Sequence, residues 1–286
     1  MLKLALPIAL QQLLVSCAQL VDTAMVRGMG NVVVSSIGGS SRWIFLMNLF
    51  YFGISSGTAA MIAQFWGARE KNSIRKSYGI ALIFGAAVAA VFMLAMFFIP
   101  KQLIRIFTSE QAVIDTAAQY MRIVAFMAPF AAFNQISCVA LRSTERVNPP
   151  LYTSIISVAL NTCLNYILIN GKLGLPAMGI RGAAIATLSS TAAQAILLFI
   201  VLRTSKDIYN SKYREFFTFG KDFFRRFPLF VFPLYSTRLP GQWAQIYTQW
   251  FLQGRAAKPM QATRFSAQLN RLPLFSLWVS ATPAQL

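Results

Sequence analysis

Hydrophobic residues are gathered into six long runs along this chain, and short polar segments separate the runs. Each run has about 20 residues or more, the length that a helix needs to cross the hydrocarbon core of a bilayer. Only two charged residues fall inside the runs, Asp22 in the first and Arg122 in the fourth. The pattern therefore predicts an all-α polytopic membrane protein, a bundle of six transmembrane helices. The predicted spans are residues 4–26, 43–68, 77–100, 116–141, 147–171 and 182–202.

The composition also favours a membrane protein. Hydrophobic residues make up 56% of the chain and charged residues 12%, about half the charged share of roughly 25% that is typical of soluble domains. The net charge of +18 would suit a nucleic-acid-binding protein, but the basic residues lie between the apolar runs, where they flank membrane spans. We therefore expect membrane lipids as partners, and no nucleic acid. Three cysteines inside the runs are predicted to be small buried hydrophobic residues: Cys17, Cys138 and Cys163.

The distribution of Lys and Arg between the loops predicts the orientation of the bundle. The loops on the N-terminal side hold 14 of these residues, and the opposite loops hold 6. Because cytoplasmic loops carry the excess of basic residues, we expect a cytoplasmic N-terminus in a multi-pass protein of the inner membrane. With six spans, the segment after Leu202 is then cytoplasmic as well.

The first span carries a polar stripe that includes its single acidic residue. Asp22 lies three residues after Gln19 and on nearly the same helix face. A charged side chain near the bilayer centre costs roughly 2.5–3.5 kcal/mol, so Asp22 either reaches the outer interface or serves a cavity as a proton- or sodium-binding carboxylate. The polar stripe favours the cavity. Its other members are Gln12, Ser16 and Thr23.

Polar side chains recur in the other spans too. Amides at such positions bond across helices as structural contacts or coordinate a cation through oxygen, and their spacing alone favours structural contacts. Pro7, one turn into the first span, either starts the helix or permits a bend. The fifth-span stripe is Ser154, Ser157, Asn161 and Asn165, and polar residues of the second and sixth spans include Asn48, Gln64 and Thr187.

Five segments together resemble one transporter family. The first span reads LALPIALQQLLVSCAQLVDTAMV, the second ends ISSGTAAMIAQFWGARE and the fourth closes with ALRSTERVNPPLY. The fifth and sixth contain ALNTCLNYILI and GLPAMGIRGAAIATLSS. In this order, over about residues 3 to 226, they resemble the multidrug and toxic compound extrusion (MATE) transporters of the bacterial DinF-like branch. The resemblance implies two six-helix lobes related by pseudo-symmetry, and secondary active export of small organic cations and drugs by antiport with H⁺ or Na⁺, without another cofactor.

The resemblance also implies roles for individual residues. Asp22 falls on the first-helix aspartate that the family uses for cation coupling, and Pro7 falls on the proline at which that helix bends. Asn161 and Asn165 match the fifth-helix polar pair near this aspartate, and Thr187 matches a sixth-helix position. The residues expected to line the cavity are Gln12, Gln19, Asn48 and Gln64.

The family-like pattern stops near Phe227. We expect a six-helix lobe at residues 1–203, a cytoplasmic basic linker at 204–226 and an aberrant tail of low order at 227–286. The tail holds six of the twelve prolines of the chain and no acidic residue, and its apolar stretches are too short or too rich in glutamine to span a membrane. Back-translated with permissive codons and read in another register from about Ser236, it resembles the seventh and eighth helices of a MATE protein. A frameshift is therefore the preferred hypothesis, and a natural short variant with a disordered tail is the alternative.

Three functions are compatible with these features. The first is a MATE-type exporter present as one lobe, which binds a cation at Asp22 and exports only with a second lobe, a second copy or a restored reading frame. The second is a related lipid-linked oligosaccharide flippase, although such proteins line the cavity with several basic residues and only Arg122 lies within a span. The third is a non-transporting membrane remnant or interaction protein. An enzyme is not expected, because the sequence shows no nucleophile–base pair, metal cluster or glycine-rich phosphate loop.

Overall fold

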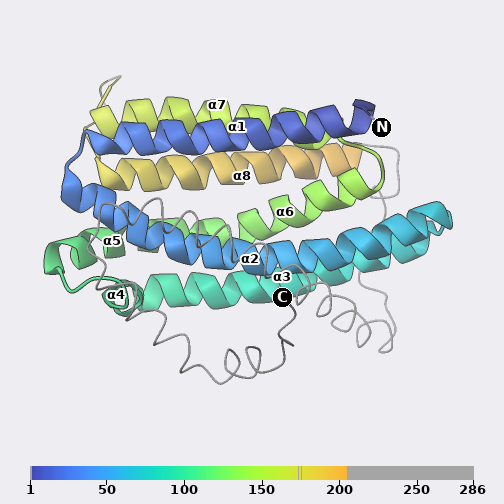
Figure 1. Cartoon of the computed structure of the whole chain (residues 1–286), viewed down its shortest axis with the longest axis horizontal. Coiled ribbons are helices and arrows are strands. Elements are labelled where there is room, and N and C mark those ends of the chain that lie inside the picture. The colour runs from blue at the N-terminus through green and yellow to red at the C-terminus, as the bar shows by residue number, and fades with distance from the viewer. Residues whose placement is uncertain (1, 173, 175, 205–286) are drawn as a thin grey trace, which may run out of the picture. The chain divides into compact units, whose positions relative to one another are not determined.

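The computed structural model describes residues 2–172, 174 and 176–204, and for residues 2–5, 19, 20, 23, 24 and 27 it describes the backbone only. Within these residues the chain folds into helices joined by turns (Figure 1). The predicted tail and nearly all of the predicted linker lie outside the described residues. The helices are α1 (Leu2–Arg27), α2 (Asn31–Gly67), α3 (Lys71–Phe98), α4 (Pro100–Arg105), α5 (Gln111–Val124), the 3₁₀ helix η1 (Ala125–Met127), α6 (Ala128–Ser143), α7 (Asn148–Asn170) and α8 (Ile180–Thr204).

The described helices confirm the predicted all-α membrane bundle. Five helical stretches are long and apolar enough to cross a membrane: α2, α3, the run Gln111–Ser143, α7 and α8. The predicted first span corresponds to α1, whose apolar stretch is Leu6–Ala18. With 26 residues, α1 rises about 39 Å, which exceeds the roughly 30 Å of the hydrocarbon core.

One helix begins well before the predicted span. The second span was expected from residue 43, but α2 begins at Asn31. In the polar segment before residue 43, serine hydroxyls bond backbone carbonyls one turn earlier: Ser36 Oγ donates to the Val32 carbonyl at 2.7 Å, and Ser40 Oγ donates to the Ser36 carbonyl at 2.8 Å. These polar side chains are thereby satisfied within the helix, which is why a polar segment is compatible with it.

The fourth predicted span is not one regular helix, and the expectation of a continuous helix over residues 116–141 is wrong at its centre. The 3₁₀ helix η1 separates α5 from α6 at Ala125–Met127. Pro129 stands at the start of α6. Because proline has no N–H and clashes with the carbonyl four residues earlier, it prevents a regular α-helix from continuing through this point.

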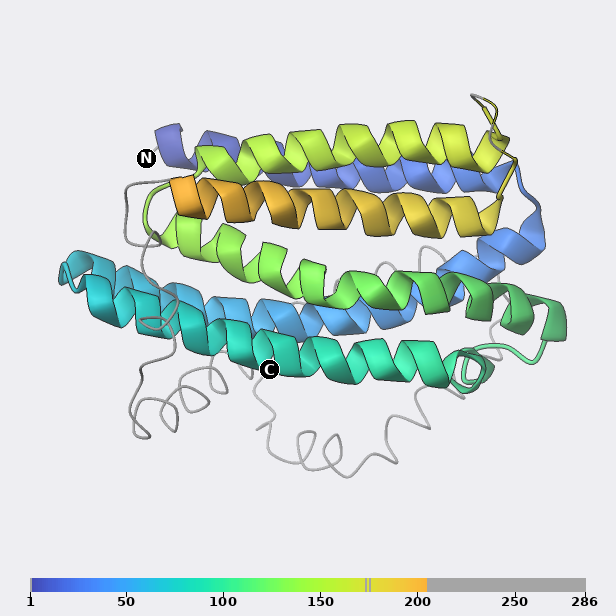
Figure 2. The ribbon, with the colours of Figure 1, turned by 180° about the vertical axis from the view of Figure 1, so that it is seen from behind.

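The helices form two groups joined by α6 and α5. Figures 1 and 2 show α1, α7 and α8 side by side, with α2 and α3 on the other side of α6. α6 packs against α2, α3 and α8, and α5 packs against α2 and α8. These contacts all lie within the compact unit that holds the described residues.

Two apolar clusters fill the space between α2, α3, α5 and α6 and extend to residues of α7 and α8. One contains Met47, Tyr51, Met96 and Met121, and the other contains residues such as Ile62, Ile80, Ile136 and Leu141. Small residues let the helices approach closely, as is common in membrane bundles. A Cβ atom on Gly85 of α3 would lie 2.5 Å from Ile136 Cδ1 of α6, and one on Gly182 of α8 would lie 2.8 Å from the backbone carbonyl of Leu168 in α7.

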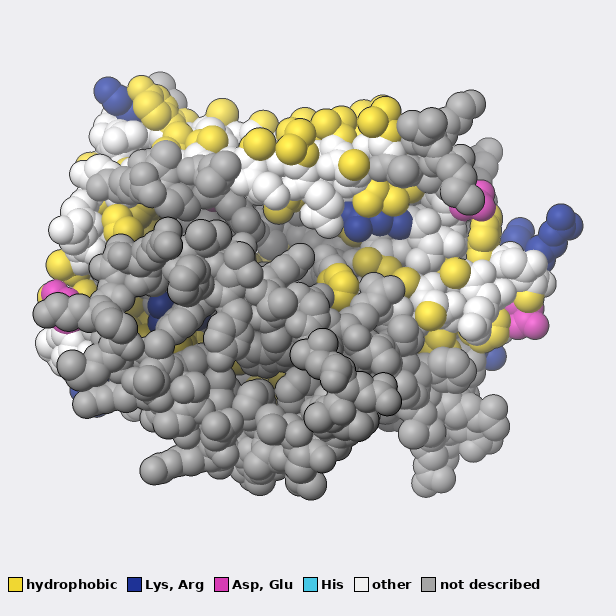
Figure 3. Space-filling model, in the orientation of Figure 1, with side chains coloured by type: hydrophobic (Ala, Val, Ile, Leu, Met, Phe, Trp, Pro, Cys, Tyr) yellow, Lys and Arg dark blue, Asp and Glu magenta, His cyan; other side chains and the backbone are white. Residues whose placement is uncertain are grey.

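The outer surface of the described bundle is rich in large hydrophobic side chains. They follow the edge formed by α1 and α7, and the charged side chains visible on this face lie mostly toward the two ends (Figure 3). Such a surface suits contact with lipid. The prediction that all three cysteines are buried holds only for Cys138, because Cys17 and Cys163 are exposed. The exposed hydrophobic residues include Leu6, Leu13, Val91, Phe98, Ile156, Tyr166, Ile196 and Ile200. The cytoplasmic orientation of the N-terminus stays a prediction.

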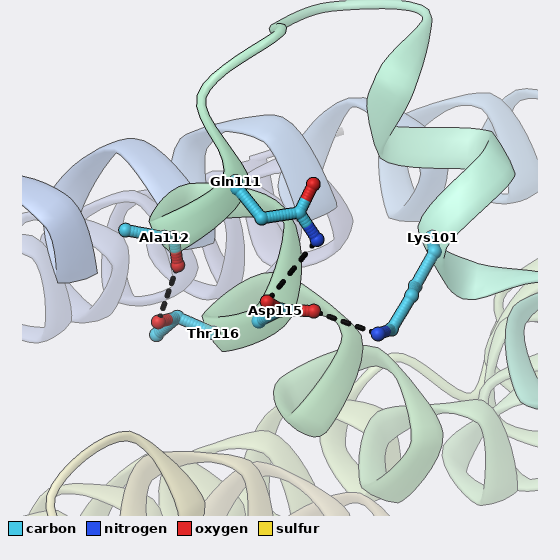
Figure 4. A network of polar contacts seen from close by, with 5 residues as sticks. All are labelled: Lys101, Gln111, Ala112, Asp115 and Thr116. Atoms are coloured by element: carbon cyan, nitrogen blue, oxygen red, sulfur yellow. Dashed lines mark hydrogen bonds and ion pairs between the residues drawn. The ribbon is translucent and has the colours of Figure 1, made fainter.

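A charged pair joins α4 to α5 at one end of the bundle. Lys101 Nζ lies 2.7 Å from Asp115 Oδ1, and Gln111 Nε2 donates to Asp115 Oδ2 at 3.2 Å (Figure 4). Both charged side chains are almost half exposed, at 47% for Lys101 and 45% for Asp115. This pair is therefore a surface contact.

Candidate functional site

The candidate site centres on Asp22, where α1 packs along α7. Asn165 Nδ2 donates to Asp22 Oδ1 at 2.8 Å. Asn165 is 3% exposed and Asn161 is 8% exposed, whereas Asp22 is half-buried. An amide N–H offsets part of the cost of removing a carboxylate from water. The structure thus brings three of the predicted coupling residues together at one helix contact.

The Asn161 amide connects Asp22 with α8. One of its terminal atoms lies 2.9 Å from Asp22 Oδ1 and 3.2 Å from Oδ2, and the same atom lies 3.1 Å from Asn165 Nδ2. The other terminal atom lies 3.3 Å from Ser190 Oγ. If the first atom is oxygen, it accepts from Asn165 and needs a proton on Asp22; if it is nitrogen, it donates to the ionised carboxylate. The orientation of the Asn161 amide is therefore tied to the protonation state of Asp22.

α8 and α5 complete the surroundings of the carboxylate. Ser190 Oγ donates to the Thr187 carbonyl at 3.0 Å, so the residue that contacts Asn161 is itself held within α8. The Thr187 side chain contacts the Tyr120 hydroxyl of α5, and Tyr120 lies close enough to Asp22 to interact with its charge.

Two residues of this region were not predicted. Tyr120 is a buried residue of α5, and nothing in the sequence distinguishes it, because its position depends on how α5 packs against α8. The second is Gln11, whose Nε2 donates to Ser154 Oγ of α7 at 2.6 Å. The spacing of polar residues could have indicated Gln11. Gln11 and Asp22 are separated by the same number of residues in the first span as Ser154 and Asn165 are in the fifth.

The remaining predicted residues occupy other surroundings. Pro7 is half-buried, and α1 continues through it as one helix. The predicted cavity lining stays a prediction: the Gln19 side chain lies outside the described residues, and the other three side chains are exposed on the described bundle. These three are Gln12, Asn48 and Gln64.

Comparisons with known proteins agree with the fold and with the resemblance. The MatE family model matches residues 7–167. "Probable multidrug resistance protein YoeA" of Bacillus subtilis (strain 168) is 31% identical over 201 residues, which are 70% of this chain and 43% of that protein. "Probable multidrug resistance protein NorM" of Thermotoga maritima (strain ATCC 43589 / DSM 3109 / JCM 10099 / NBRC 100826 / MSB8) is 27% identical over 205 residues, which are 71% of this chain and 44% of that protein.

A solved structure shares the fold. "Crystal structure of MATE in the bent conformation" superposes with a TM-score of 0.75 at 22% identity, over 86% of this chain and 54% of that chain. The chain spans less than half the length of the two curated relatives. The assignment to the DinF-like branch stays a prediction. Because the family model covers more than half of the 286 residues and includes Asp22, Asn161 and Asn165, this multi-pass membrane protein belongs to the MatE family, the multidrug and toxic compound extrusion transporters.

Proposed function

We propose that this chain forms the ion-coupling half of a secondary active exporter of organic cations, with Asp22 as the group that takes up H⁺ or Na⁺. The observation that carries the proposal is the contact of the Asp22 carboxylate with the buried amides of Asn161 and Asn165. The names of the curated relatives, which are multidrug resistance proteins, support export of drugs as the task of the whole transporter.

The amide groups around Asp22 suit either coupling ion. A proton on Asp22 Oδ2 would donate to the Asn161 oxygen, which lies 3.2 Å away in one amide orientation, and Oδ1 would stay the carbonyl oxygen that accepts from Asn165. A sodium ion would instead take oxygen ligands, as hard cations do, from the Asp22 carboxylate and the two asparagine oxygens. Asn165 Oδ1 is buried and accepts no hydrogen bond from the described residues, so within them its lone pairs are open to such a ligand.

Ion uptake would act through the contact between α1 and α7. The Asn165 hydrogen bond holds Asp22 of α1 against α7, and neutralising the carboxylate weakens that bond because charge-assisted hydrogen bonds are the stronger ones. An ion that changes this contact thereby shifts the population of α1 positions. A bound organic cation that relies on the negative charge of Asp22 would be released in the same step.

The direct test is ion-dependent binding of ethidium to the 286-residue chain in nanodiscs, followed by fluorescence polarisation. Wild-type protein is expected to bind ethidium at neutral pH and to release it on acidification or on addition of NaCl, with choline chloride as the ionic-strength control. Asp22→Asn should weaken binding by roughly tenfold or more, which corresponds to about 1.4 kcal/mol, and should remove the response to the coupling ion.

Asp115→Asn is the matched control, because Asp115 is an exposed carboxylate outside the candidate site. An unchanged pH and sodium response in Asp22→Asn would contradict the proposal. Absence of ethidium binding to folded wild-type protein would favour the non-transporting remnant. Sensitivity to sodium at fixed pH identifies Na⁺ as the coupling ion, and sensitivity to pH alone identifies H⁺.

Uphill transport is a separate question. Transporters with internal repeats alternate access by moving one repeat against the other, and this chain spans 43% of the YoeA relative. We therefore expect the 286-residue chain by itself to bind ethidium without accumulating it in proteoliposomes. Accumulation against a gradient that depends on Asp22 would overturn this expectation.

A further inference from the structure

A second polar cluster joins α1 to its neighbours, nearer the N-terminal end of that helix than Asp22. Gln11 Nε2 donates to Ser154 Oγ of α7 at 2.6 Å, and Arg142 Nη2 of α6 donates to Gln11 Oε1 at 2.6 Å. Gln194 Nε2 of α8 donates to the same Ser154 oxygen at 3.1 Å. Gln11 is 6% exposed. These four residues, Gln11, Arg142, Ser154 and Gln194, are called the Gln11 cluster below.

The chemistry of the cluster fixes how Gln11 is oriented. Arginine offers only hydrogen-bond donors, so the Gln11 oxygen must face Arg142. The Gln11 nitrogen then faces Ser154, whose oxygen accepts from two amides. Gln11 thereby uses both ends of its side chain, and one of its two bonds is charge-assisted and correspondingly strong. The cluster ties α1 to α6 and α7, and Gln194 adds α8.

The Gln11 cluster and the Asp22 contact keep one register between α1 and α7. Gln11 bonds a residue 143 positions later in the chain, and so does Asp22. Eleven residues of an α-helix make three turns plus about 20° and rise about 16 Å, so both contacts fall on one seam between parallel helices. A slip of α1 by one residue would rotate it by about 100° and would take Asp22 away from Asn165.

We propose that Gln11 is a positioning residue for the coupling carboxylate: through Arg142 and Ser154 it fixes the rotation and height of α1 on α7, and so keeps Asp22 facing Asn165. The inference rests on the proposed role of Asp22 and adds to it a second residue that acts at a distance. Gln11 touches neither the ion nor the substrate in this role.

Infrared difference spectroscopy of the 286-residue chain between acidic and alkaline pH tests the proposal without any transport assay. The C=O stretch of protonated Asp22 is the carboxyl band that Asp22→Asn removes. Gln11→Leu should move this band to higher wavenumber, because a carbonyl that loses the Asn165 N–H donor absorbs at higher energy. Gln11→Glu should restore the band, since the new carboxylate accepts from both Arg142 and the Ser154 hydroxyl.

Tyr51→Phe is the matched control for loss of a buried interhelical hydrogen bond. The Tyr51 hydroxyl of α2 donates to the Ala128 carbonyl of α6 at 3.0 Å, and neither residue belongs to α1 or α7. This variant should lower the melting temperature and leave the Asp22 band in place. If Gln11→Leu does not fold, Ser154→Ala removes the same contact from α7 and should move the band in the same direction.

The outcomes separate this inference from the proposed function. A folded Gln11→Leu protein with an unmoved Asp22 band overturns the positioning role, whatever the ethidium assay shows. If Gln11→Leu shifts the band but the wild-type protein does not bind ethidium, the positioning role stands and the proposed substrate is overturned. If no carboxyl band depends on Asp22, both proposals fall.

Discussion

The two groups of helices are held together in different ways. Between α1, α7 and α8 the contacts include a carboxylate and several amides, as in Asp22 with Asn165 and Gln11 with Ser154. α2, α3 and α6 pack mainly through two apolar clusters, which also reach α8, with isolated hydroxyl bonds such as that between Tyr78 and Ser137 at 2.8 Å. One group therefore has polar contacts that involve charged groups, and the other has mostly apolar ones.

This difference suggests which group responds to an ion. A proton or a sodium ion changes the hydrogen bonds of a carboxylate directly, but it has no differential interaction with a cluster of Ile and Met side chains, and a ligand shifts an equilibrium only through such a difference. The α2–α3–α6 group is therefore suited to be a frame, and the contact of α1 with α7 is suited to be the part that changes. The predictions below test this division.

The largest expected effect comes from Gly182, because α7 and α8 must pack closely for the polar contacts among α1, α7 and α8 to form. A Cβ at this position would meet the backbone of Leu168 at 2.8 Å, and backbone atoms cannot move aside without shifting a helix. Gly182→Ala should therefore destabilise the protein by about 2–3 kcal/mol. Thermal unfolding in detergent measures the effect.

Gly85 in the apolar group provides the comparison. Its Cβ would clash with the Cδ1 atom of Ile136, at 2.5 Å, and the next atom, Ala132 Cβ, lies at an ordinary contact distance of 3.6 Å. The end of a flexible side chain such as Ile136 can move. Gly85→Ala should cost about 1 kcal/mol or less. Gly38→Ala is the control, since nothing lies within 4 Å of that Cβ, and it should stabilise α2 by about 0.5 kcal/mol. Equal losses of stability in Gly182→Ala and Gly85→Ala would contradict the view that the α7–α8 contact is less able to adapt than the α3–α6 contact.

The fold was more predictable than the site. Six apolar runs of sufficient length imply six helices almost regardless of detail, since backbone groups in lipid must bond within their own segment. The prediction missed the start of α2 at Asn31, because the segment before residue 43 is polar, and it missed the interruption of the fourth span at Pro129.

In the site, Asp22, Asn161 and Asn165 were predicted from spacing and family resemblance because each helix face can be read from its own sequence. Tyr120 and Gln11 were missed. Both omissions concern the rotation of one helix relative to another. That rotation is set by packing between segments distant in the chain.

A smaller effect is expected from removing single hydrogen bonds in the two groups. Double-mutant cycles with Asp22→Asn and Asn165→Leu should give a coupling of about 1.5 kcal/mol, near the upper end for membrane proteins, because one partner is charged. The cycle with Tyr78→Phe and Ser137→Ala should give about 0.6 kcal/mol, the usual value for such bonds. Both are measured as free energies of unfolding at neutral pH.

The two cycles should also respond differently to acid. The Asp22–Asn165 coupling should fall when Asp22 is protonated, whereas the Tyr78–Ser137 coupling, between neutral groups, should stay constant. If both cycles give the same coupling energy at both pH values, the hydrogen bonds of the α1–α7–α8 group do not respond to protons differently from those of the α2–α3–α6 group.

The smallest effect is expected at the exposed ion pair of Lys101 and Asp115, whose charged atoms lie 2.7 Å apart but in neither group's interior. With both side chains almost half exposed, water and salt screen the attraction, and ordering two flexible chains offsets what remains. Asp115→Asn should leave the melting temperature unchanged within error, in low and in high salt, and ethidium binding should stay at the wild-type level. Asp115 and Asp22 are both carboxylates in contact with hydrogen-bond donors. If Asp115→Asn leaves ethidium binding unchanged and Asp22→Asn weakens it strongly, the number of partners does not make a carboxylate responsive. Burial at the α1–α7 contact is then the feature that does so in this protein.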